Sequence, residues 1–152
     1  MTQTRGVAEQ VNALGAFDAV IHNAAVGYRE PRRIETEDGL SHVFAVNTMA
    51  PYLLTAWIMR PRRLVYLSSL LHQDGDSTLH DPTWKERPWD GLQAYSDTKL
   101  HDALLAFAVE RLARCPVECA RTWMGENQDG RSAGDGRSGR RPSHPGVTGG
   151  WR

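Results

Sequence analysis

The chain has few cysteines, few lysines and no long apolar run. Cys115 and Cys119 are the only cysteines among its 152 residues, and their spacing matches no zinc-binding pattern. Two unpaired thiols are typical of a reducing compartment, so we expect a cytoplasmic protein without a metal. No apolar stretch reaches the length of a membrane span, and no secretory signal precedes residue 4. We therefore expect no membrane partner.

Net charge is also absent, although the charges are unevenly distributed. Residues 121–152 carry six Arg and three acidic residues, which leaves 12 basic and 15 acidic residues in 1–120. No basic stripe is interleaved with aromatic residues, so the sequence predicts no nucleic-acid partner. The length and the apolar fraction of 40% indicate a globular domain with a real core.

No Gly-x-Gly-x-x-Gly turn occurs in residues 1–120, so the usual pyrophosphate-binding motif is missing. Apolar positions at Val7, Val11 and Leu14, followed by Gly15, predict a helix over 4–14. An apolar run over 17–22 predicts a strand. A helix, a tight link and a strand make up the second half of a βαβ unit, which indicates an α/β fold.

Small residues follow this strand. Asn23, Ala24 and Ala25 stand at its carboxyl end, where open α/β sheets bind ligands, and small side chains let a ligand approach the backbone. An ordinary exit from a strand into a loop explains the same residues equally well.

A second helix is predicted from Thr36 to Ile58, with Thr36 as its capping residue. Asn47 lies within the apolar stripe of this helix, where a buried amide needs partners. Pro51 has no N–H, so the Asn47 carbonyl loses its usual helical bond and a kink is expected. Asn47 could then hold a water, or it could be a purely structural residue at the kink.

The run 64–69 predicts a buried strand that ends in Ser68 and Ser69, whose hydroxyls would reach the ligand crevice. Without a Gly-x-Ser-x-Gly turn, an α/β-hydrolase is disfavoured. Residues 71–91 are polar and irregular, and we expect them to form a long connection over the site.

The helix predicted over 92–114 carries the most informative pair. Tyr95 and Lys99 are four residues apart, which places the phenol and the ammonium on one helix face, and Leu104 and Phe107 continue its apolar positions. An ammonium nearby favours the phenolate, so Tyr95 could exchange a proton near neutral pH. An ordinary amphipathic helix with a solvated lysine is the alternative.

Taken in order, these motifs resemble the short-chain dehydrogenase/reductase family, in particular its retinol-dehydrogenase-like branch. The resemblance covers roughly residues 4–114. It implies that Tyr95 is the general acid/base, Lys99 lowers its pKa and holds the nicotinamide ribose, Ser69 orients the substrate carbonyl, and Asn47 holds a relay water. It also implies that Asn23, Ala24 and Ala25 line an NAD or NADP site.

The same resemblance implies strands and a glycine-rich turn before residue 4. Residues 121–152 hold eight Gly and six Arg but few apolar residues, so we expect a disordered tail. Reading Thr122 to Arg131 one base later can yield a Pro-Gly-Trp phrase typical of the family. A single-base slip near Cys115 is therefore a hypothesis, which the nucleotide sequence would test.

We thus expect a partial Rossmann-like domain, part of a doubly wound parallel sheet, over residues 1–120, with two strands and about three helices. The expected function is hydride transfer between NAD(P)H and a small carbonyl or secondary alcohol. The alternative is a catalytically inactive fragment or interaction module, and a sugar-nucleotide epimerase is a third interpretation. Surfaces that would pack on further strands predict self-association or a homo-oligomer.

Overall fold

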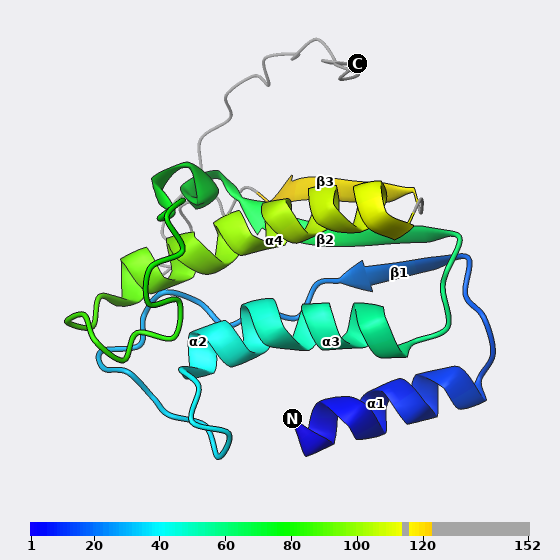
Figure 1. Ribbon diagram of the computed structural model, residues 1–152, viewed down its shortest axis with the longest axis horizontal. Helices are drawn as coiled ribbons and strands as arrows, with labels where there is room; N and C mark the ends of the chain where they lie inside the picture. The colour runs from blue at the N-terminus through cyan, green and yellow to red at the C-terminus, as the bar shows by residue number, and fades with distance from the viewer. Residues whose placement is uncertain (114–115, 123–152) are drawn as a thin grey trace, which may run out of the picture.

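One parallel sheet organises the chain. The computed structural model describes residues 1–113 and 116–122. Strands β1 (Ala19–His22), β2 (Arg63–Ser69) and β3 (Val117–Thr122) lie in the order β1-β2-β3 (Figure 1). Parallel strands joined by helical crossovers confirm the predicted α/β class and its partial Rossmann-like architecture.

The prediction of two strands is wrong, because β3 pairs with β2 along its whole length, from Val117 opposite Leu64 to Thr122 opposite Ser69. This segment mixes polar and apolar residues and shows no continuous apolar run, so its sequence does not resemble a buried strand. Arg121 and Thr122, the first two residues of the expected tail, belong to β3. Residues 123–152 and Cys115, near which the base slip was expected, lie outside the described residues.

The helices form at nearly the predicted places. Their bounds are α1 (Thr2–Ala13), α2 (His42–Phe44), the π-helical turn η1 (Ala45–Met49), α3 (Ala50–Trp57), the 3-10 turn η2 (Leu70–Asp74) and α4 (Gly91–Ala113). Gly15 ends the first helical segment with φ of 95°, a left-handed conformation that favours glycine. None of the described helices is long and apolar enough to cross a membrane.

The second helix begins at His42, later than predicted. Thr36 caps no helix: its hydroxyl and N–H both bond the Leu40 carbonyl and close a turn in which Gly39 has φ of 74°. A bridge between Glu35 and Ser41 holds the ends of this turn together. The capping pattern therefore formed a local turn, an alternative that threonine side chains commonly offer the backbone.

Helices α3 and α4 cover the same face of the sheet, as right-handed crossovers between neighbouring strands require. Tyr66 of β2 bonds Thr55 of α3, and Ser68 of β2 donates to the Lys99 carbonyl of α4. In the described residues the opposite face of the sheet has no helix (Figure 1). The structure is thus a one-sided portion of a doubly wound sheet.

A polar chain crosses the interface between β1, β2 and α3. His22 Nε2 lies 2.9 Å from the Thr55 hydroxyl, which lies 2.6 Å from the Tyr66 hydroxyl. Burial lowers the pKa of His22 to about 4, because the imidazolium would lose its hydration there. His22 is therefore neutral near neutral pH and belongs to the packing of the sheet.

We predict that His22 makes folding sensitive to acid. Its folded pKa lies below the ordinary value of 6.5, so stability is full above pH 6.5 and falls as the pH drops toward 4. Between about pH 7.5 and about pH 4.5 the unfolding free energy should fall by about 2 kcal/mol more in the native chain than in His22→Gln. Urea unfolding followed by circular dichroism measures both drops, and equal drops would contradict the assignment.

Candidate functional site

The expected site residues meet at one edge of the sheet. Because β1 and β2 are parallel, their carboxyl ends lie side by side, and α4 begins against the same edge. Asn23 to Ala25 follow β1, Ser69 ends β2, and Tyr95 and Lys99 lie in the first turns of α4. The structure therefore brings together residues up to 76 positions apart in sequence.

A cavity of about 320 Å³ lies between these segments, lined by Asn23, Ala25, Val26, Gly27, Leu67, Tyr95 and Lys99. Ala24 does not face it. This residue lines a second cavity of about 480 Å³ beside α1 and η1, which Asn23 also borders. Of the three residues after β1, Asn23 and Ala25 thus line the cavity that Tyr95 and Lys99 also line, whereas Ala24 lines only the second cavity.

Tyr95 is buried, with 3% of its surface exposed. Its phenol hydrogen-bonds the Ser69 side chain, and the Tyr28 ring meets its ring edge-on at a centroid distance of 5.7 Å. Burial raises the pKa of Tyr95, and the Asp102 charge raises it further, while the bond from Ser69 opposes both. The net shift of this pKa is therefore upward, with burial as its largest cause, and the lowering expected from Lys99 stays a prediction.

The Lys99 ammonium lies close to Tyr95 but is bonded to two other groups. It donates to the Leu67 carbonyl at 2.8 Å and to Asp102 Oδ2 at 2.8 Å, and it lies 5.7 Å from the centroid of the Tyr95 ring. Both partners of the ion pair are buried, with 4% of Lys99 and 3% of Asp102 exposed. The carboxylate partly compensates the ammonium, so the two charges act on the phenol in opposite directions.

Asp102 was missed at the sequence level. It lies seven residues after Tyr95 and three after Lys99, so a helix places all three on one face. The spacing is visible in the sequence, but an ion pair on a helix is usually exposed and contributes little to stability, so it gave no reason to single out Asp102. Burial raises the pKa of Asp102 to about 6, against the lowering influence of Lys99, so the carboxylate is mostly ionised at neutral pH.

Asn47 is held by its side-chain amide. Its Oδ1 accepts from the Val26 N–H at 2.8 Å, and its Nδ2 donates to the Val26 carbonyl at 3.0 Å and to the Thr98 hydroxyl at 3.1 Å. The amide is therefore occupied by protein atoms, contrary to the expectation that it is available to a water. The helical irregularity expected near Pro51 appears as the π-helical turn η1, in which the Ala50 N–H donates to the Ala45 carbonyl.

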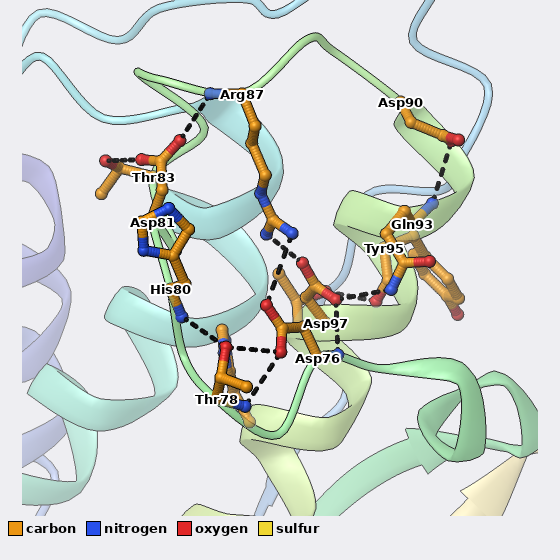
Figure 2. Close-up of polar contacts among 12 residues, drawn as sticks. Asp76, Thr78, His80, Asp81, Thr83, Arg87, Asp90, Gln93, Tyr95 and Asp97 are labelled. Atoms are coloured by element: carbon orange, nitrogen blue, oxygen red, sulfur yellow. Dashed lines mark hydrogen bonds and ion pairs between the residues drawn. The ribbon is translucent and has the colours of Figure 1, made fainter.

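The connection between η2 and α4 has a defined conformation, which Arg87 stabilises through several contacts. Figure 2 shows this side chain reaching from the loop toward Asp76 and Asp97, and it pairs with Asp97 of α4 and, at 3.7 Å, with Asp76. Its guanidinium also stacks on the Trp84 ring at 3.7 Å. We call these four residues the Arg87 cluster.

Two glycines hold the ends of that connection close to the rest of the chain. A Cβ at Gly75 would come within 2.9 Å of the Ser96 carbonyl, and one at Gly91 within 2.8 Å of the Glu30 carbonyl. Between them, Asp81 accepts three successive backbone N–H groups, from Lys85 to Arg87. The segment thus has internal bonds of its own in addition to the ion pairs that tie it to α4 (Figure 2).

No metal site accompanies this arrangement: in the part of the chain that the structure describes, no three His, Cys, Asp or Glu side chains are grouped to hold an ion. A parallel sheet with a buried tyrosine and lysine lining one cavity at its carboxyl edge, and a buried serine bonded to the tyrosine, defines a Rossmann-like α/β protein with a candidate proton-transfer site.

Comparisons with known proteins identify the family. The chain is 44% identical over 113 residues to an uncharacterized oxidoreductase of Emericella nidulans, a match covering 73% of this chain and 42% of that protein. It is 39% identical over 114 residues to a short-chain dehydrogenase of Penicillium rubens, covering 73% and 43%. With retinol dehydrogenase 13 of Mus musculus it shares 35% identity over 99 residues, covering 61% and 28%. No protein-family model matches the chain.

Solved structures share the fold. An uncharacterized protein from Mycobacterium Paratuberculosis superposes with a TM-score of 0.69 at 24% identity, over 83% of this chain and 48% of that one. A short-chain dehydrogenase from Sphingobium yanoikuyae in complex with NADPH gives 0.53 at 16% identity, over 79% and 45%. The chain belongs to the short-chain dehydrogenase/reductase family, and it spans less than half the length of the curated relatives it matches.

We predict that Asn47 carries a large share of local stability. Asn47→Ala leaves the Val26 N–H and carbonyl without their partner and should cost about 2–3 kcal/mol of unfolding free energy. Thr98→Val is the matched control, since it removes one acceptor of the same amide, and should cost about 1 kcal/mol. Urea titration measures both, and an Asn47→Ala curve that overlays the native one would refute the role.

We predict that the Arg87 cluster holds residues 75–91 in place and protects this segment from proteolysis. Arg87→Gln leaves the buried Asp97 carboxylate without its cation, so cleavage by chymotrypsin in residues 75–91 should accelerate about tenfold. Arg62→Gln makes the same change at an exposed ion pair, 3.7 Å from Asp18, and should leave the rate unchanged. Equal cleavage of the two variants would show that the cluster does not hold the loop.

Proposed function

We propose that this chain carries the catalytic part of an NAD(P)-dependent oxidoreductase that interconverts a small carbonyl compound and its alcohol. The observation that carries the proposal is that Tyr95 and Lys99 line the same cavity, with Ser69 bonded to the Tyr95 phenol. Its curated relatives include an oxidoreductase and a short-chain dehydrogenase, which supports the reaction class. The absence of a long apolar helix in the described residues and the two thiols agree with a cytoplasmic setting.

In this proposal Tyr95 moves the proton. Its phenol gives a proton to the carbonyl oxygen during reduction and takes one from the alcohol during oxidation. Ser69, already bonded to the phenol, orients the same substrate oxygen. Lys99 stabilises the phenolate and holds a ribose, and the Asn47 main chain supports a relay water, while its amide fixes the backbone at Val26.

The residues present fit the nicotinamide half of the cofactor, which supplies or accepts the hydride when bound. The 320 Å³ cavity suits a group of that size, and Ala25 and Gly27 at its border leave the backbone accessible. Asn23, Ala25, Tyr95 and Lys99, which line this cavity, are the proposed contacts, whereas Ala24 lines the neighbouring cavity. The comparison structure in complex with NADPH supports a nicotinamide cofactor, with NAD and NADP both open for this chain.

One observation favours the second candidate, a catalytically inactive member. The pKa of Tyr95 is raised, which disfavours the phenolate that oxidation requires. Such a chain would act through its surface. Phe107 and Leu112 of α4 are 68% and 83% exposed, and they fit the self-association predicted from the sequence.

Binding and turnover separate the two candidates. With NADH or NADPH and a panel of aldehydes and ketones, we expect turnover that falls at least about 100-fold in Tyr95→Phe. Tyr52→Phe, at a half-exposed tyrosine, is the control and should be unaffected. Nicotinamide fluorescence should show binding that survives Tyr95→Phe and weakens in Lys99→Met. No binding by the native chain would favour the inactive candidate.

A further inference from the structure

A buried carboxylate stands behind the proposed proton-transfer pair, and the proposed reaction gives it no role. Tyr95, Lys99 and Asp102 occupy successive turns of one face of α4. Asp102 Oδ2 lies 2.8 Å from the Lys99 ammonium, and both side chains are at most 5% exposed. A charge pair withdrawn from water to this degree is costly unless it has a task or full compensation.

The surroundings leave Lys99 as the one charged partner that acts on Asp102 in the described residues. Tyr95 is faced by Tyr28 from the segment after β1 and by Ser69 from β2, and it feels the Asp102 charge. The neighbouring His101 points elsewhere, toward the Thr48 hydroxyl of η1 at 3.2 Å. Two opposite charges therefore lie near the tyrosine, the Lys99 ammonium 5.7 Å from its ring centroid and the Asp102 carboxylate paired with that ammonium.

We propose that Asp102 is a positioning residue: it fixes the Lys99 ammonium at the carboxyl end of β2 and, while ionised, offsets the ammonium's attraction for the Tyr95 phenolate. The inference rests on the proposed role of Tyr95 as the proton donor and acceptor. The aspartate thereby shifts the site toward the protonated phenol, which is the form that reduces a carbonyl. The second acceptor of Lys99, the Leu67 carbonyl, keeps the ammonium in place when the charge is removed.

The test removes the charge of Asp102 and keeps its shape. In Asp102→Asn the amide oxygen still accepts from Lys99, while the ammonium is no longer compensated. We expect the pKa of Tyr95 to fall by about one unit, the size typical of a nearby unbalanced charge. Carbon-13 NMR of Cζ-labelled tyrosine reports each of the four tyrosines separately, and Tyr95→Phe assigns the signal. Circular dichroism at each pH marks the range in which the chain stays folded.

Two further variants keep the result interpretable. Asp74→Asn removes the same charge from an exposed position and should leave Tyr95 unchanged. Lys99→Met leaves the Asp102 charge unopposed and should raise the pKa of Tyr95 by about one unit, and the double variant, which carries neither charge, should return this pKa close to its native value. An unchanged pKa of Tyr95 in Asp102→Asn, or an unchanged pKa in Lys99→Met, would overturn the proposal.

This measurement needs no turnover, so it separates the two claims. A lowered Tyr95 pKa with no hydride transfer would support the offset by Asp102 and contradict the proposed function. In an active chain, the acid limb of the pH–rate profile for alcohol oxidation should move down by the same amount in Asp102→Asn. A fixed limb beside measurable activity would contradict the role of Asp102 alone.

Discussion

The arrangement depends on one buried ammonium. Lys99 has left water, and a charge in that position is tolerated only if it is bonded at short range. The Leu67 carbonyl and Asp102 provide those bonds, one from the sheet and one from the same helix. The first bond ties α4 to the end of β2, which is why Tyr95 arrives beside Ser69. Position and electrostatics at the site therefore have a common cause.

The contacts of α4 change in character along the helix. Near its start the buried residues Ser96, Asp97, Thr98 and Lys99 are polar, whereas further along Leu105, Ala106 and Val109 pack with Leu64, Tyr66 and Val117 of the sheet. Apolar packing therefore holds the later part of the helix, and hydrogen bonds with defined directions hold the part that carries the site. Such polar contacts are specific in geometry but leave little tolerance for an unpaired group.

The sequence allowed the strand ends and the Tyr–Lys face to be predicted, because both follow from periodicities over a few residues. It did not show β3, whose pairing partner is distant and whose composition is mixed. The apolar pattern of α4 also led to the expectation that Leu104 is buried, because this pattern was interpreted as the buried face of the helix. At 100° per residue, however, that position lies opposite Tyr95. The loop that carries the Arg87 cluster could not be foreseen, since Asp81 and Trp84 within this loop adopt positive φ without being glycine.

The π-helical turn η1 determines how the side chains of α3 are rotated about the helix axis relative to those of α2. A turn that closes over five residues advances the helix by one residue more than an α-helical turn, and one residue corresponds to about 100° of rotation. Before this turn α2 packs on α4, within it Asn47 reaches Val26, and after it Thr55 reaches His22 and Tyr66. A straight α-helix of the same sequence could not satisfy all three. The extra residue of η1 thus rotates α3 relative to α2, so that residues before, within and after the turn each face their own partners in the sheet and at the site.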